Sequence, residues 1–194
     1  MKDEIQIHNI MTSLARKRPC YNSEDDLKHA LAWEIHGVYD NLPIRLEVPF
    51  DLGDKRGYVD ETAGRTYIEV KYPTMTSVLN HRDETYHLRD CSANPMRYQF
   101  WKDVERLERL KEHMNIRGLA IMLTNYHRFW RPSRWGKPTT DEEFRMEDGL
   151  IRQGTLQYRN SSYEPIHLRG VYECKWHPYS SIGGVEFRYL VVEV

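Results

Sequence analysis

Residues 58–71 read Tyr58-Val59-Asp60, then a short polar turn over residues 61–65, then Thr66-Tyr67-Ile68-Glu69-Val70-Lys71. Side chains alternate between the two faces of a β-strand, so Glu69 and Lys71 point the same way while Ile68 and Val70 point the other way. The second segment therefore predicts a strand with a carboxylate and an ammonium group on one face and an apolar anchor on the other.

The turn at 61–65 would form a hairpin that brings Asp60 next to Glu69. Mg²⁺ is commonly bound by a few carboxylates together with water and phosphate oxygens, so these two acids are candidate metal ligands beside Lys71. Each residue also has a purely structural interpretation. Acids such as Asp60 are common at turns, and a Glu-x-Lys step on an exposed strand usually forms a solvated pair.

The same spacing occurs a second time near the C-terminus. Glu173-Cys174-Lys175 repeats the Glu-x-Lys step, and Glu164 precedes it by the interval that separates Asp60 from Glu69. We prefer the first set because it follows a helix with a core-facing Glu and precedes a second helix and a buried strand. The second set is followed only by a terminal strand.

The core-facing acid is Glu34, on a helix predicted to begin after the N-cap Ser23 and to run to about Val38. Leu27, Leu31 and Val38 define an apolar stripe of this helix, and Glu34 falls on it. A buried carboxylate is costly without a partner or a metal. Glu34 is therefore a candidate site residue, and pairing with an arginine such as Arg45 is the alternative.

Periodicity and turn signals predict an α/β order of elements. A first helix runs from about Ile7 up to the basic stop at residues 16–19. The helix after Ser23 is followed by three strands, a small hairpin insert, a helix from near Pro95, and a buried strand. The strands are expected at 44–52, 57–61 and 66–72, the hairpin at 74–79 and 84–88, the buried strand at 118–124, and further strands around 154–158, 170–176 and 185–194.

The whole chain has 194 residues, 29% charged residues and a formal net charge of −1. This length favours a single domain over residues 1–194. The three cysteines Cys20, Cys91 and Cys174 are far apart and odd in number, which favours a reducing compartment and a cytoplasmic location. No apolar run has the length of a membrane span, and the N-terminus lacks the pattern of a secretory signal. Bulk charge does not predict a nucleic-acid partner.

The element order and the Asp60…Glu69-Val70-Lys71 motif resemble the PD-(D/E)XK nuclease superfamily, whose fold is restriction-endonuclease-like. This resemblance covers a core of about residues 20–125, and residues 126–194 would be a strand-rich extension. Segments 23–31, 97–103 and 104–108 are similar to a narrower group of bacterial proteins with this fold and no settled function. The resemblance implies a central mixed β-sheet flanked by helices. It also implies Mg²⁺ or Mn²⁺ held by Asp60, Glu69 and the Val70 carbonyl, with help from Glu34.

Further residues are candidates for supporting roles. Gln99 and Asp103 lie four apart on the second long helix and can face the same region; the resemblance implies that they and Arg97 support the site or touch the nucleic-acid backbone. Ordinary helix-surface hydrogen bonds are the alternative. A basic, aromatic segment follows the buried strand, and it can neutralise phosphates and stack on bases. Its candidate nucleic-acid-binding residues are Arg128, Arg131, Arg134, Trp135 and Lys137.

We therefore expect a Mg²⁺-dependent nuclease that hydrolyses DNA phosphodiester bonds. A catalytically silent module of the same fold that binds DNA or protein is the first alternative. A domain that only forms a homo-oligomer, such as a homodimer, is the second. A zinc site near His81, His87 and Cys91 has no paired Cys-x-x-Cys or His-x-x-x-His motif to support it.

Overall fold

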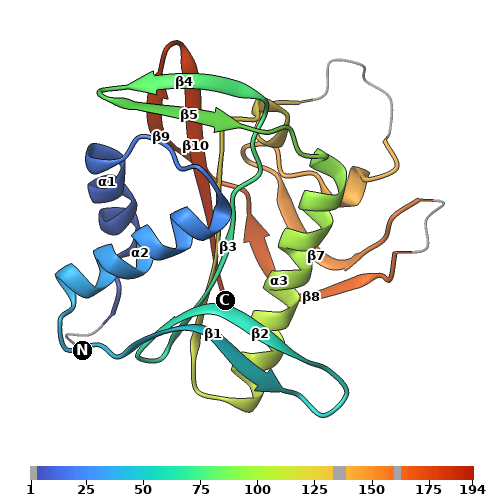
Figure 1. Cartoon of the computed structure of the whole chain (residues 1–194). Helices are drawn as coiled ribbons and strands as arrows, with labels where there is room; N and C mark the ends of the chain where they lie inside the picture. Colours follow the sequence, from blue (N-terminus) through green and yellow to red (C-terminus); the bar gives the residue numbers. More distant parts are fainter. Residues whose placement is uncertain (1–3, 133–138, 160–162) are drawn as a thin grey trace.

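A computed structural model of the chain describes residues 4–132, 139–159 and 163–194 (Figure 1). Its helices are α1 (Ile7–Lys17), α2 (Glu24–Val38) and α3 (Ala93–His113), with short 3₁₀ turns at His127–Phe129 and Glu142–Phe144. The strands are β1 (Ile44–Asp51), β2 (Arg56–Ala63), β3 (Thr66–Lys71), β4 (Ser77–His81), β5 (Glu84–Leu88), β6 (Arg117–Thr124), β7 (Ile151–Leu156), β8 (Ile166–Glu173), β9 (Trp176–Ile182) and β10 (Val185–Glu193).

The central sheet of the described chain has six strands in the order β1-β2-β3-β6-β10-β9. Strands β3 and β6 are parallel and the other neighbours are antiparallel. Parallel neighbours need a crossover connection, and here α3 lies within it, after the β4–β5 hairpin. The predicted central mixed sheet flanked by helices is confirmed, as is the hairpin insert.

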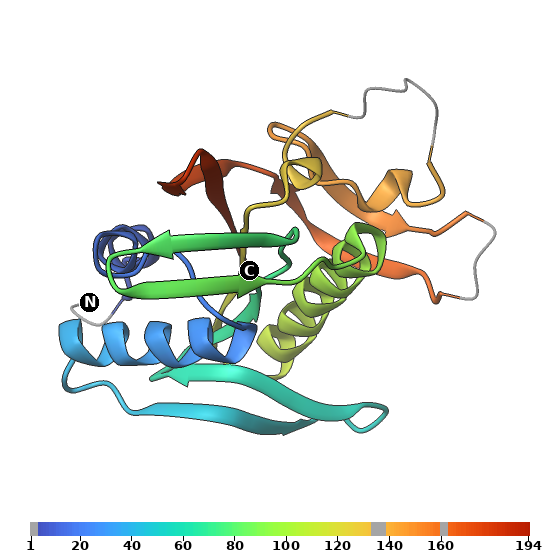
Figure 2. The same cartoon turned by 45° about the horizontal axis from the view of Figure 1, so that its top comes forward.

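Helices cover both faces of this sheet (Figure 2). Ile68 and Val70 of β3 pack in one core with apolar residues of α1 and α2. On the neighbouring strand, Ala120 and Met122 pack in a second core with α3. The alternation of side chains along each strand therefore separates two cores. It also directs Glu69 and Lys71 away from the core that contains Ile68 and Val70.

The long helices begin and end close to their predicted limits. Ser23 caps α2, since its hydroxyl accepts the N–H of Asp26 at 3.1 Å, and three acids in the first turn suit the positive end of the helix. Val38 is predicted on the buried stripe of α2 but is 57% exposed. Ile35 is the buried residue after Glu34 instead.

The extra C-terminal strands are present, but β7 and β8 begin three and four residues before the predicted segments 154–158 and 170–176. The sequence patterns do not predict β9 as a strand of its own. It pairs with β10 across a turn in which Gly183 and Gly184 both have positive φ, a conformation that suits glycine. Pro178 lies inside β9, and proline is tolerated there because β9 is at the edge of the sheet.

Cys20, Cys91 and Cys174 are all free thiols. None of the helices within the described ranges has the length and apolar character that a membrane crossing requires.

Candidate active site

Asp60 is held at the point where β2 and β3 separate. The pairing of these strands runs from Ala63 and Thr66 to Glu61 and Ile68. Immediately beyond this pairing, a carboxylate replaces a backbone carbonyl as the hydrogen-bond acceptor. Asp60 Oδ2 accepts the N–H of Val70 at 2.8 Å. The structure thus brings Asp60 next to the Glu69-Val70-Lys71 step.

Three cations lie among the acids of this region. Lys28 Nζ is 2.8 Å from Asp60 Oδ1. Lys71 Nζ is 2.8 Å from Asp103 Oδ2 and donates to the Val70 carbonyl oxygen at 3.2 Å. Arg106 lies 2.8 Å from Glu69 Oε1 and also pairs with Asp103.

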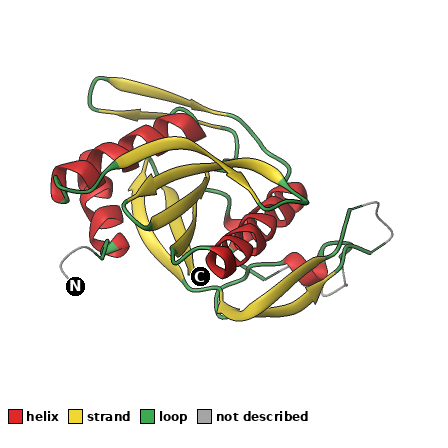
Figure 3. Ribbon diagram, turned by 90° about the horizontal axis from the view of Figure 1, so that it is seen from below, coloured by secondary structure: helices red, strands yellow, loops and turns green. Residues whose placement is uncertain are grey.

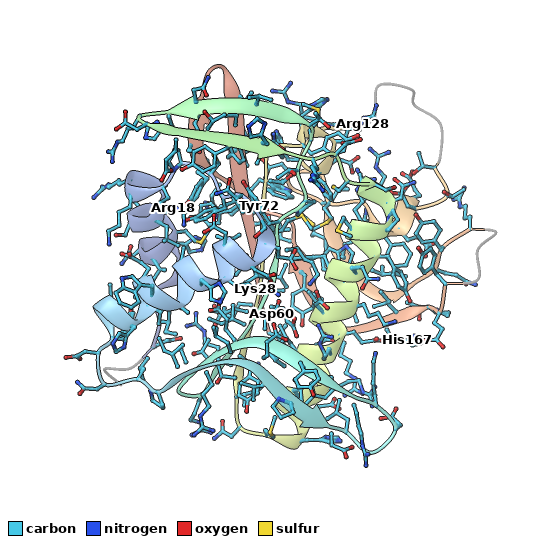
Figure 4. The ribbon with its side chains drawn as sticks, in the orientation of Figure 1. Arg18, Lys28, Asp60, Tyr72, Arg128 and His167 are labelled. Atoms are coloured by element: carbon cyan, nitrogen blue, oxygen red, sulfur yellow. The ribbon has the colours of Figure 1, made fainter. Side chains whose placement is uncertain are left out.

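We call these residues, together with Glu24, the charged cluster. It consists of Glu24, Lys28, Asp60, Glu69, Lys71, Asp103 and Arg106, from α2, β2, β3 and α3. Figure 4 shows Lys28 and Asp60 between α2, β3 and α3. The cluster has four acids and three bases, so it carries one formal negative charge.

Burial controls the acid–base behaviour of the cluster. Glu69 and Asp103 are only 2% and 4% exposed. Burial raises the pKa of Glu69, and the nearby Asp103 carboxylate raises it further, against the opposing effect of Arg106. Burial also acts to raise the pKa of Asp60, but Lys28 and the Val70 N–H outweigh it and hold that pKa below its usual value.

Lys71 remains a cation in this environment. Burial acts to lower its pKa, but the carboxylates of Asp103 and Glu24 outweigh burial and raise the pKa above its ordinary value. Asp103, which the sequence suggests only as a supporting residue, therefore holds the ammonium group of Lys71 in place.

Glu24 is a member of the cluster that the sequence interpretation missed. The sequence identifies it only as a first-turn acid of α2, but its Oε2 accepts the N–H of Tyr72, the residue after Lys71, at 2.9 Å. Lys28, one helical turn later, is 3.8 Å from Glu24. A Glu and a Lys at this spacing, on the same side of α2 as the buried Leu31, is the signal that would have identified the pair.

Glu34 is buried as expected, but it lies elsewhere. Its carboxylate accepts from Ser13 Oγ and Lys17 Nζ, both at 2.6 Å, so its partners are on α1. Neither Arg45 nor the charged cluster is among them. Glu34 is ten residues after Glu24, which places it about 15 Å further along the helix axis. The part of α2 near Glu34 packs against α1 instead.

The structure places the other candidates for supporting roles, Arg97 and Gln99, in different surroundings. Arg97 is buried and pairs with Asp141 at 2.5 Å, and it donates to the backbone carbonyl of Arg128. It therefore ties α3 to the segment after β6 and does not join the cluster. Gln99 is exposed on α3, and its side chain makes no hydrogen bond to the described residues.

The predicted nucleic-acid segment is only partly described. Arg134, Trp135 and Lys137 lie outside the described residues. Arg128 stacks over the Tyr126 ring at 5.6 Å, and Arg131 lies 3.9 Å from Glu186. In Figure 4, Arg128 lies near the amino-terminal end of α3, well separated from Asp60. Arg128 is therefore not beside the cluster, and the acid partner of Arg131 is on β10.

The acids of the cluster are arranged around protein cations. Among the described residues, no group of three or more His, Cys, Asp or Glu side chains is placed to hold a metal ion, and this includes the neighbourhood of His81, His87 and Cys91. Two buried oxygens, Glu69 Oε1 and Asp103 Oδ2, nevertheless lie beside cations without accepting an aligned hydrogen bond. Carboxylate oxygens of this kind are suitable ligands for a hard divalent cation.

No family model, curated protein or solved structure matches this chain. Function is therefore inferred from the charged cluster and its surroundings.

Proposed function

We propose that this chain is a metal-dependent phosphodiesterase that hydrolyses DNA, with a restriction-endonuclease-like core. The observation that carries the proposal is the meeting of Asp60, Glu69 and Lys71. Asp60 accepts the N–H of Val70, the residue between the other two. Carboxylates beside a charged amine are the groups that metal-assisted phosphodiester hydrolysis requires.

The order of elements supports the same proposal. Helix α2 precedes the antiparallel strands β1, β2 and β3, and α3 then leads to β6, which is parallel to β3. This is the order that underlies the resemblance to the PD-(D/E)XK superfamily. In this arrangement α2 and α3 supply Glu24, Lys28, Asp103 and Arg106 on either side of the strand motif.

Asp60, Glu69 and the Val70 carbonyl would hold Mg²⁺ or Mn²⁺. The chemistry of these donors fits, because Glu69 is buried in a cluster with an excess of acid and its pKa is raised there. An added divalent cation would stabilise the ionised form of Glu69. When bound, the metal supplies a Lewis acid for the phosphate oxygen and a water of lowered pKa. Glu24 takes the helix position that the sequence suggests for Glu34.

Lys71 would act as a source of positive charge and not as a general base. Its raised pKa keeps the amine protonated at neutral pH, so it can donate a hydrogen bond to phosphate oxygens as negative charge develops on them. Asp103 is a positioning residue, because its carboxylate lies 2.8 Å from that amine. Lys28 and Arg106 would have to leave Asp60 and Glu69, at least in part, for the metal to enter.

Cleavage of supercoiled DNA with Mg²⁺ or Mn²⁺ tests the proposal. The variants Asp60→Asn and Lys71→Ala should each reduce the rate by roughly 10²-fold or more, as expected for removal of a metal ligand or of a charge-stabilising donor. Glu173→Gln and Lys175→Ala are matched controls at the second Glu-x-Lys step, and they should retain the wild-type rate. Equal cleavage by wild type and the two site variants would show that the activity comes from a contaminant.

A second candidate function is a DNA- or protein-binding module without turnover. The observation in its favour is that Asp60, Glu69 and Asp103 are each already paired with a lysine or arginine. Calorimetric titration with Mg²⁺ separates the two functions. Binding heat that disappears in Asp60→Asn supports the nuclease, and absence of binding in the wild type supports the module.

A further inference from the structure

One side of α3 and the turn between β1 and β2 form a basic face beside the charged cluster. Lys102, Arg106 and Arg109 occur at i, i+4 and i+7, so they lie on the same side of the helix. The turn that contains Lys55 lies against this side, since Arg109 pairs with Asp54 and the Arg106 guanidinium is 5.8 Å from the centre of the Phe50 ring. Figure 3 shows the β1–β2 hairpin next to α3.

The cations of this basic face are incompletely neutralised. Asp54 pairs with Arg109, and Glu105 accepts the backbone N–H of His167 at 2.7 Å. Within the described ranges, Lys55 and Lys102 have no acid within ion-pair distance; Lys102 instead lies 5.5 Å from the centre of the Tyr98 ring. Burial lowers the pKa of Lys55, and the positive charges of Lys102, Arg106 and Arg109 lower it further, with Glu105 opposing.

The segment first predicted to bind nucleic acid is different in this respect. In that segment Arg131 lies 3.9 Å from Glu186 of β10, which also pairs with Arg188, and Arg128 stacks on the Tyr126 ring. On the basic face, Lys55 and Lys102 lie near Arg106 and Arg109 with no described acid at ion-pair distance from either lysine, and a bound anion would relieve the repulsion among these cations. Arg106 belongs both to this face and to the charged cluster, so an anion bound here would lie next to Glu69 and Lys71.

We propose that the basic face, formed by Lys55, Lys102, Arg106 and Arg109, binds the phosphate backbone of DNA and delivers a phosphodiester to the charged cluster. The identity of the partner rests on the proposed nuclease function. Lysines that bind phosphates supply affinity that is independent of sequence and that weakens as salt rises, because binding releases condensed counterions. The basic face should therefore control affinity and its salt dependence.

The test is the affinity of the full chain for a short DNA duplex, measured by fluorescence anisotropy in EDTA over a range of salt concentrations. The double variant Lys55→Gln/Lys102→Gln should bind more weakly at every concentration, and its slope of log affinity against log salt should fall by about 1.8 in magnitude, about 0.9 for each phosphate that is no longer neutralised. Lys111→Gln is the matched control. Lys111 is exposed and lies nine positions after Lys102, about two and a half helical turns, on the opposite side of α3.

Unchanged affinity and slope in the double variant would overturn the proposal. An equal loss of affinity for polyglutamate would also overturn it, because the face would then be a general polyanion surface. Thermal unfolding provides the check on folding: removal of two mutually repelling lysines should leave the melting temperature unchanged or raise it. Binding in EDTA does not require cleavage, so a protein that binds DNA through these lysines but never cuts it would contradict only the nuclease.

Discussion

The chain contains the step Glu-x-Lys twice in strand-like surroundings, and the two copies behave differently. In both, the middle residue is completely buried, Val70 in β3 and Cys174 just after β8. Glu69, however, is 2% exposed, whereas Glu173 and Lys175 are both exposed.

The difference arises from what surrounds each strand. β3 is an inner strand of the central sheet, and α2 and α3 bring further charged groups to it. Among the described strands, β8 pairs only with β7, in a two-stranded sheet, and one face of it packs on α3. The upstream acids differ too, since Asp60 binds the Val70 N–H while Glu164 is exposed. The same spacing along a strand therefore forms a buried charged cluster only where other elements cover it.

The largest expected difference between the two copies is in how much their ion pairs contribute to the free energy of unfolding. Asp103→Ala removes the acid that pairs with both Lys71 and Arg106, and it leaves two largely buried cations short of a partner. We expect a decrease of about 3 kcal/mol in the free energy of unfolding. Glu173→Ala, in the exposed copy, should change it by less than about 0.5 kcal/mol. Urea denaturation measures both, and similar values for the two variants would remove the distinction between the copies.

The pH dependence of stability sharpens the same comparison. Because the pKa of Glu69 is raised in the folded state, the unfolded chain releases this proton at lower pH, and stability falls as pH rises from the ordinary glutamate pKa toward the raised value. Glu69→Gln should remove this share of the decline, which amounts to at most ~1.4 kcal/mol for each pH unit between the two pKa values. The rest of the decline should persist in this variant, because the pKa values of Glu24 and the fully buried Glu61 are also raised.

Melting temperatures from pH 5 to pH 9 provide the measurement for Glu69→Gln. Glu173→Gln is the control, and it should follow the wild-type curve throughout this range. A wild-type curve that rises over the same range, or a Glu69→Gln curve parallel to it, would contradict the assignment of a raised pKa to Glu69.

The smallest expected effect separates the two glutamates of α2. Glu34→Gln weakens the ion pair with Lys17, whose side chain is 61% exposed, so it should cost only about 1 kcal/mol of stability and leave DNA cleavage intact. Glu24→Gln should reduce the cleavage rate with little change in stability. Chemical denaturation measures the stability of both variants, and cleavage assays measure their activity. The reverse pattern of effects would assign Glu34, and not Glu24, to the active site.

Much of the architecture followed from local patterns. The N-cap at Ser23 and the alternation in β3 each depend on residues that are close in sequence, and both appear in the structure. β9 was missed because its signal is weak: Pro178 interrupts it, and its stability comes from pairing with β10. The composition of the site was harder to predict, since Glu24, Lys28 and Arg106 are ordinary helix residues until α2 and α3 converge on β3.

Near neighbours in the chain were enough to specify where most helices and strands form and which face of β3 carries Glu69 and Lys71, because caps, turns and side-chain periodicity act over a few residues. The partners of each charged side chain were settled by packing. The first turn of α2 meets β3 while the turn around Glu34 meets α1. The energy of a buried charge depends on groups distant in sequence, so only the folded arrangement distinguishes Glu24 from Glu34 and Glu69 from Glu173.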